Sequence, residues 1–287
     1  MKPAPYALTN RLLMFVCALA AALGAGLAQG TGLERNALSP DILFEPGRQL
    51  RLDVVQTRPS VSGVSVPGGI ATGDVGRVST RTELGIKWNA ASGRDYALLV
   101  DQPITGDIRY PDGTGYPLAG SEATLESDVL RFMVRQPLEA GWSLLGGVSG
   151  IRLKGAVALP LATPSGARAA YHVTADGGEG VAGFIGFAWE RPELAQRLSL
   201  VYETSARLRS DAIERSAVFA GLVPDATIHE TISVTVPQSL TLSARTGLPG
   251  DFLLFGSVRW ADWTRFQVDP DGFRLMTGRP LIGYDED

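Results

Sequence analysis

The nearly unbroken alternation of apolar and polar side chains over residues 197–210 constrains the fold more than any other feature of this sequence. One face carries Leu198, Leu200, Tyr202, Ala206 and Leu208, and the other carries Arg197, Ser199, Glu203, Ser205, Arg207 and Arg209. Strands in soluble domains usually have about 5–6 residues, whereas a tilted strand needs about 9–11 residues to cross a bilayer. The length of this alternation therefore favours a membrane-spanning strand.

The same period of two recurs along the chain and predicts about ten or eleven antiparallel strands after Gln49. The expected connections are short at residues 90–94 and 248–250. They are longer and rich in glycine, proline and acidic residues at 63–77, 105–120 and 163–180. Short turns at one end and long loops at the other are typical of outer-membrane barrels. The pattern predicts an all-β fold, an antiparallel transmembrane β-barrel.

The polar faces of these strands would project into one lumen if the sheet closes. The predicted lumen residues are Arg51, Asp53, Arg81, Glu83, Arg131, Arg135, Glu203, Arg207 and Arg259. The alternative is the solvated outer face of a soluble sandwich, which also shows alternating charges. Strand length favours the lumen.

The first 28 residues have the features of a signal peptide. Lys2 and Arg11 supply positive charge, residues 12–23 are apolar, and small residues precede an expected cleavage after Ala28. The apolar run is shorter than the roughly 20 residues of a spanning helix. Cys17 is the only cysteine, so the mature chain would contain neither a disulfide nor a cysteine metal site.

The sequence offers little support for catalysis. A G-x-G-x-x-G pattern at residues 178–183 lacks the strand–helix setting that dinucleotide binding needs. His172 and His229 have no partner at zinc-ligand spacing, and no serine has the surroundings of a nucleophile elbow, which disfavours a lipase. His229 alternates with Thr231 and is expected to face a wet interior. The formal net charge of −4 gives no indication of nucleic-acid binding. We expect no enzyme activity, cofactor or metal.

Residues 231–268 resemble the outer-membrane long-chain fatty acid transporter family, which includes channels for aromatic hydrocarbons. Pro237 matches a proline that ends a strand in that family. A W-x-x-W-[ST]-x-F signature is matched by Trp260, Trp263, Thr264 and Phe266. Residues 30–35 are similar to a Gly-Leu-x-Arg stretch of the family's N-terminal hatch.

This resemblance implies a fourteen-stranded barrel, plugged by a hatch, in the outer membrane of a Gram-negative bacterium. Residues 29–48 would form the hatch and 49–287 the barrel. The ligands would be long-chain fatty acids or aromatic hydrocarbons, released sideways into the membrane. Lateral release keeps an alkyl tail out of water, where exposure costs about 0.8 kcal/mol per methylene. The other expected partners are outer-membrane lipids and the barrel-assembly machinery, with the protein a monomer.

Leu38, Ile42, Leu43 and Phe44 are the hatch residues predicted to touch a hydrophobic ligand, although they could equally wedge the plug against the wall. The sequence departs from the family in two ways: it has no Asn-Pro-Ala hatch motif, and it stops at Asp287, where family members continue. We therefore expect an incomplete barrel that lacks C-terminal strands. The main alternative is a secreted or periplasmic soluble β-sandwich with a binding or structural role.

Overall fold

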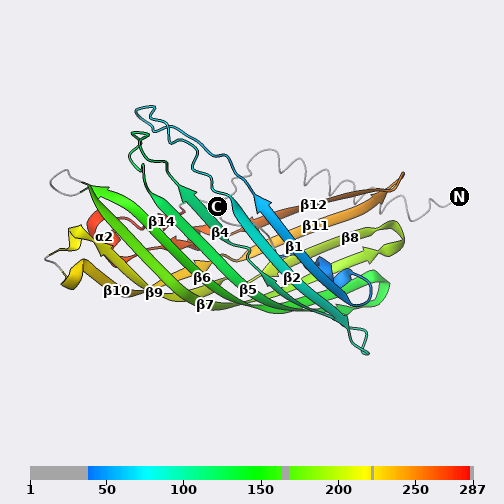
Figure 1. Cartoon of the computed structure of the whole chain (residues 1–287). Coiled ribbons are helices and arrows are strands. Elements are labelled where there is room, and N and C mark those ends of the chain that lie inside the picture. The colour runs from blue at the N-terminus through cyan, green and yellow to red at the C-terminus, as the bar shows by residue number, and fades with distance from the viewer. Residues whose placement is uncertain (1–37, 163–167, 221–222, 285–287) are drawn as a thin grey trace.

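A computed structural model describes residues 38–162, 168–220 and 223–284, which form one curled antiparallel sheet of twelve strands (Figure 1). The predicted all-β, antiparallel fold is confirmed. The predicted signal peptide and the first part of the hatch lie outside the described residues. No helix in the described ranges is long and apolar enough to cross a bilayer.

The strands of the sheet are β1 (Gln49–Thr57), β2 (Ser79–Asn89), β3 (Asp95–Asp101), β4 (Thr105–Arg109), β5 (Glu122–Pro137), β6 (Trp142–Ala162), β7 (Arg168–Arg191), β8 (Gln196–Glu203), β9 (Ala206–Ser216), β10 (Thr227–Val236), β11 (Ser239–Leu248) and β12 (Phe252–Ala261). A second sheet pairs β13 (Gln267–Val268) with β14 (Ile282–Gly283). The helical elements are η1 (Asp41–Phe44), η2 (Glu139–Gly141), η3 (Pro192–Leu194), η4 (Ala217–Phe219), η5 (Pro224–Ala226), η6 (Trp263–Arg265) and α2 (Asp271–Thr277).

The main path through the sheet is β1-β2-β3-β5-β6-β7-β8-β11-β12, so β1 and β12 are its two edges. The sheet curls into a trough with short turns at one end and the loops 58–78 and 110–121 at the other (Figure 1). We call these the turn end and the loop end. The prediction of a long loop at residues 163–180 is wrong for residues 168–180, which belong to β7 and pair with β6 and β9.

Two long strands of the sheet are each broken into two shorter ones at the same level, which gives β8 and β9 in one case and β10 and β11 in the other. β8 and β9 both pair with β7, while β10 pairs with β9 and β11 with β8. The interruptions are at Thr204–Ser205 and Pro237–Gln238. They lie opposite each other, since Glu203 pairs with Ser239 and Ala206 with Val236.

The interruption reverses which residues face inward. Glu203 and Ala206 both lie on the concave side although three residue steps separate them, so inward positions are odd-numbered in β8 and even-numbered in β9. Leu208 is therefore buried, and Arg207 is exposed on the outer face. The prediction that Arg207 faces the lumen is wrong. The alternating segment 197–210 is divided between β8 and β9, and its inward positions change from odd to even numbers at the break.

The turn half of the sheet has an apolar outer face. Strand register places Leu50, Ile86, Leu98, Phe132 and Val148 in one row across five neighbouring strands. All five side chains are more than a third exposed. Trp88, Tyr96 and Phe132 stack on the same face, with ring centroids 5.8 to 6.5 Å apart. Such a surface suits contact with acyl chains.

The loop half has the opposite polarity. Register aligns Asp128, Arg152, Glu179, Arg209 and Ser233 in a charged row on the outer face. On the inner face of the same strands, a hydrophobic core contains Val129, Ile151, Leu208 and Ile232. His229 is exposed on the outer face, so its predicted interior position is also wrong. The sheet is thus apolar outside at the turn end and apolar inside at the loop end.

Candidate functional site

The concave side of the loop half encloses an apolar cavity of about 560 Å³. Inward side chains of β5, β6, β7, β9 and β10 supply much of its wall, among them Leu125, Leu153, Val173, Leu208 and Ile232. Ligand sites for small molecules commonly have volumes of about 300–1,000 Å³. The cavity is therefore large enough for a small hydrophobic compound.

Loop residues cover the cavity at the loop end. Val61, Val75 and Tyr110 line it, and Tyr110 stacks on Tyr116 with ring centroids 5.2 Å apart. The Asp74 carboxylate accepts hydrogen bonds from the backbone of Val61 (3.0 Å) and Gly76 (3.1 Å), which fold this loop; these bonds lower the pKa of Asp74.

The polar groups inside the cavity are few and mostly neutral. Burial raises the pKa of the Tyr110 and Tyr284 hydroxyls above the ordinary value, so both phenols stay protonated at neutral pH. Two charged residues also belong to the lining: Asp107 lies 4.0 Å from Arg77, and the half-exposed Lys154 forms an ion pair of 2.9 Å with Glu126. The site can therefore bury apolar groups and offer hydroxyls to a polar end.

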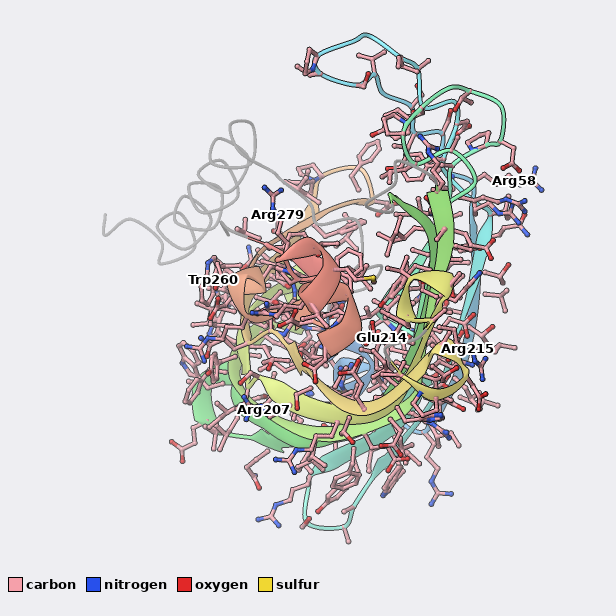
Figure 2. The ribbon with its side chains drawn as sticks, turned by 90° about the vertical axis from the view of Figure 1, so that its left-hand side faces the viewer. Arg58, Arg207, Glu214, Arg215, Trp260 and Arg279 are labelled. Carbon is pink, nitrogen blue, oxygen red and sulfur yellow. The ribbon has the colours of Figure 1, made fainter. Side chains whose placement is uncertain are left out.

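The C-terminal segment 263–284 lies inside the trough and closes the cavity from within (Figure 2). Val268, Leu281 and Ile282 supply part of the lining. Glu214, which is fully buried beneath α2, anchors this segment. Its carboxylate accepts hydrogen bonds from the backbone N–H groups of Gly272 (2.7 Å) and Phe273 (2.9 Å) and from the Tyr171 hydroxyl (2.6 Å).

Gly272 allows the close approach between α2 and the wall. A Cβ at this position would lie 2.9 Å from the Glu214 carboxylate, 2.8 Å from Phe219 and 2.7 Å from Ile228. The sequence gives no sign of this packing, because no periodicity marks residues 263–284 as a segment that turns inward.

The turn half of the trough holds a buried network of charges. The Glu190 carboxylate forms ion pairs with Arg135 (2.6 Å) and Arg197 (3.0 Å). Lys87, which is 2% exposed, forms an ion pair of 2.9 Å with Asp95. Because buried charges are costly unless they are paired, the network fixes the relative positions of β2, β3, β5, β7 and β8.

The described part of the predicted hatch, residues 38–48, is attached to this network. Arg197 forms an ion pair with Asp41 (2.7 Å), and the guanidinium carbons of Arg197 and Arg135 lie 3.9 and 4.3 Å from the ring centre of Phe44. The Lys87 ammonium donates to the carbonyls of Glu45 (2.8 Å) and Gly47 (3.0 Å). Residues 38–48 are thus held by cations of the surrounding strands.

The four predicted ligand-contacting residues of the hatch occupy a core at the turn end. Leu38, Ile42 and Leu43 are buried against inward residues of the wall, and Phe44 packs beside them. None of the four lines the apolar cavity. They pack this segment against the inner face of the sheet, and both the hatch role and ligand contact by these residues stay predictions.

The structure brings most of the predicted lumen charges together. Arg51 and Arg81 both lie within ion-pair distance of Glu83, at 3.3 and 3.6 Å, and Arg51 also pairs with Asp53 at 2.5 Å. Arg131 pairs with Glu203 at 3.2 Å. Arg135 belongs to the buried network, and Arg259 donates to Thr241 at 3.1 Å. Only Arg207 among the predicted set lies outside.

Several members of the buried network were not among the predicted lumen residues. Lys87 and Arg197 do occupy the polar positions of alternating strands, so this signal could have identified them. Asp95 and Glu190 lie at strand ends, where alternation gives no assignment. Among the described residues, no group of three or more His, Cys, Asp or Glu side chains could hold a metal ion.

The signature residues divide between the two faces. Trp260 is 48% exposed on the outside, whereas Trp263 and Phe266 are buried in the trough, with ring centroids 5.5 Å apart, and contact Tyr284. Pro237 is buried at the wall interruption. The signature therefore marks the place where the chain leaves β12 and turns inward.

No protein-family model and no curated protein sequence matches this chain. Solved structures do. A FadL homologue from Pseudomonas aeruginosa has 16% sequence identity and a TM-score of 0.62, over 84% of this chain and 66% of that protein. A deletion mutant of TodX, a monoaromatic hydrocarbon channel, has 14% identity and a TM-score of 0.55, over 79% and 64%.

CymD, another monoaromatic hydrocarbon channel, has 15% identity and a TM-score of 0.50, over 78% of this chain and 62% of that protein. The chain thus spans a little under two thirds of the length of these channels. At such identities the likeness concerns the fold. Over the share of its length that aligns, this chain has the all-β, antiparallel fold of part of such a barrel, as a curled open sheet with β1 and β12 at its edges.

Proposed function

We propose that this chain belongs to an outer-membrane channel for passive uptake of hydrophobic small molecules, with long-chain fatty acids as the first candidate ligands. The observation that carries the proposal is the apolar cavity inside a sheet whose outer face is apolar at the opposite end. The fold likeness to two monoaromatic hydrocarbon channels supports it. Uptake needs no chemical step.

The arrangement of polarity supports entry from the loop end. A hydrophobic compound would exchange water for the cavity lining and gain about 25 cal/mol per Å² of apolar surface buried. The charged network at the turn end would oppose its onward passage, because an apolar compound cannot replace the ion pairs there. We infer that the compound leaves sideways, through the wall.

The wall interruption is our candidate for that exit. Thr204, Ser205, Pro237 and Gln238 lie in the gaps between strands, and Leu208 and Val234, a few residues away, line the cavity. Proline has no backbone N–H, so Pro237 cannot donate to a strand ladder. Lateral exit at this level would keep an alkyl chain buried from cavity to membrane.

Filling the cavity should block uptake. Ala175 lines the cavity on the inner face of β7, and the Ala175→Trp substitution places an indole ring in the ligand space. Overpacking a site costs about 1–3 kcal/mol, so uptake at low ligand concentration should fall about tenfold or more. Labelled oleate and labelled toluene, supplied to a deletion strain that carries each variant, measure the effect.

Ala170→Trp is the matched control, because Ala170 lies on the same strand but is exposed outside. Uptake by this variant should equal that of the wild type. Oleate transport without toluene transport would assign fatty acids, and the reverse would assign neutral hydrocarbons. If Ala175→Trp takes up each ligand as fast as the wild type does, the proposed role of the cavity is contradicted.

A charge on the apolar outer face distinguishes the channel from a soluble sandwich. Val148 is 53% exposed in the middle of the apolar rows. In a membrane, Val148→Arg should cost about 2–4 kcal/mol and reduce the amount of heat-modifiable barrel in outer-membrane fractions. A soluble protein would tolerate an arginine at an exposed position with little change.

Thr174→Arg is the control for this substitution, because Thr174 is exposed on β7 beyond the charged row. It should assemble as well as the wild type. If Val148→Arg also assembles normally and the protein stays in the soluble fraction, the membrane assignment is lost and the periplasmic sandwich is favoured.

A further inference from the structure

Two arginines at the boundary of the apolar outer face have no assigned role. Arg207 and Arg209 are exposed on the outside of β9, two residues apart and therefore on the same face (Figure 2 labels Arg207). Within the part of the chain that the structure describes, neither guanidinium has an acidic oxygen within ion-pair distance. Both positive charges are available to an external group.

The neighbouring strand β10 adds hydroxyl groups beside both arginines. On β10, Arg209 pairs in register with Ser233 and Arg207 with Thr235. Directly opposite residues of antiparallel strands have Cβ atoms about 4.5–5.5 Å apart, so the two hydroxyls and two guanidiniums form one group. Two acids lie beside Arg209: Glu179 is opposite it on β7, and Asp211, which accepts a hydrogen bond from Thr231, is two residues away on the same face of β9.

The position of this group in the sheet indicates what it would bind. Arg209 belongs to the charged outer row, and Arg207 is two residues closer to the turn end. Val181, two residues beyond Glu179 in the same direction, is 71% exposed and begins the apolar surface that continues through Ile185. A molecule with a phosphate at the arginines would extend apolar chains along this surface.

We propose that Arg207, Arg209, Ser233 and Thr235 form a binding site for the phosphate group of an outer-leaflet lipid. The site rests on the proposed function for its orientation, since long loops mark the external end of such barrels. Guanidinium groups bind phosphate through paired hydrogen bonds, and the hydroxyls donate further ones. The adjoining apolar rows accommodate the acyl chains.

The test uses the purified full chain in uncharged maltoside micelles and measures its binding of lipid A, a glycolipid with two phosphates. The double variant Arg207→Gln/Arg209→Gln should bind lipid A about 30-fold more weakly, about fivefold for each arginine lost. Arg207→Lys/Arg209→Lys keeps the charges and should retain most of the affinity.

Arg215→Gln is the matched control, because Arg215 is an exposed arginine of the same strand that lies farther from the apolar rows. It should bind as the wild type does. Inorganic phosphate tests for a site that needs no acyl chains: competition at concentrations equimolar with lipid A would show a free-phosphate site and overturn the lipid assignment.

Equal binding of lipid A by the double Gln variant and wild type would also overturn the proposal. Oleate and toluene uptake in cells separates this outcome from failure of the proposed function. If Ala175→Trp reduces uptake but the double Gln variant binds lipid A as the wild type does, only the lipid site is rejected. If Ala175→Trp takes up both ligands as the wild type does, the proposed channel is rejected, and the lipid A measurement in micelles still tests the lipid site.

Discussion

Replacing Glu214 with alanine should release the C-terminal segment from the trough. The substitution leaves the Tyr171 hydroxyl and two backbone N–H groups of α2 without their acceptor. Each unsatisfied buried group costs about 1–3 kcal/mol, so docking of residues 263–284 should weaken by about 4 kcal/mol. Hydrogen exchange of the α2 amides should then accelerate about a thousandfold.

Graded variants test whether the carboxylate itself is responsible. Glu214→Gln keeps one acceptor oxygen and should give an intermediate effect, and Tyr171→Phe, which removes one donor, should give the smallest. Arg274→Ala is the control on α2, since it breaks only the exposed ion pair with Asp269. If exchange in Glu214→Ala is as slow as in Arg274→Ala, the anchor is elsewhere.

The Arg197→Ala substitution should free the plug at the turn end. Arg197 is 3% exposed and contacts Glu190, Asp41 and Phe44. Its removal leaves Glu190 with Arg135 as its remaining ion-pair partner in the network and detaches the hatch from the wall. Breaking a buried ion pair costs about 3–5 kcal/mol, so amide exchange in residues 38–48 should accelerate by more than a hundredfold.

A loosened plug should also admit polar solutes, which entry of a small hydrophilic antibiotic into cells would report. Arg191→Ala is the control at the same end of the sheet, because Arg191 pairs with the exposed Glu193. Exposed pairs contribute less than about 1 kcal/mol, so little change is expected. Slow exchange of residues 38–48 in Arg197→Ala would show that the apolar contacts of Leu38, Ile42 and Leu43 hold the plug alone.

Within each continuous strand, alternation separated the two faces, but it did not decide which face is inside, as His229 in β10 shows. It placed Arg51, Arg81 and Glu83 on one face, and the structure joins their charges on the concave side. It could not reveal the ion partners at strand ends, such as Glu190, because these depend on which strands become neighbours. Nor could it locate the cavity, which is formed by residues from the whole range 59–284.

The sequence by itself determined that long, two-faced antiparallel strands make up this protein, since a period of two follows directly from the extended backbone. Tertiary structure decided which face is inside. A period of two is identical for either orientation, and the break at Thr204–Ser205 between β8 and β9 shifts the phase by one, so Leu200 faces out while Leu208 faces the cavity. Only strand pairing fixes that choice, because it places each row beside water, lipid or the opposite wall.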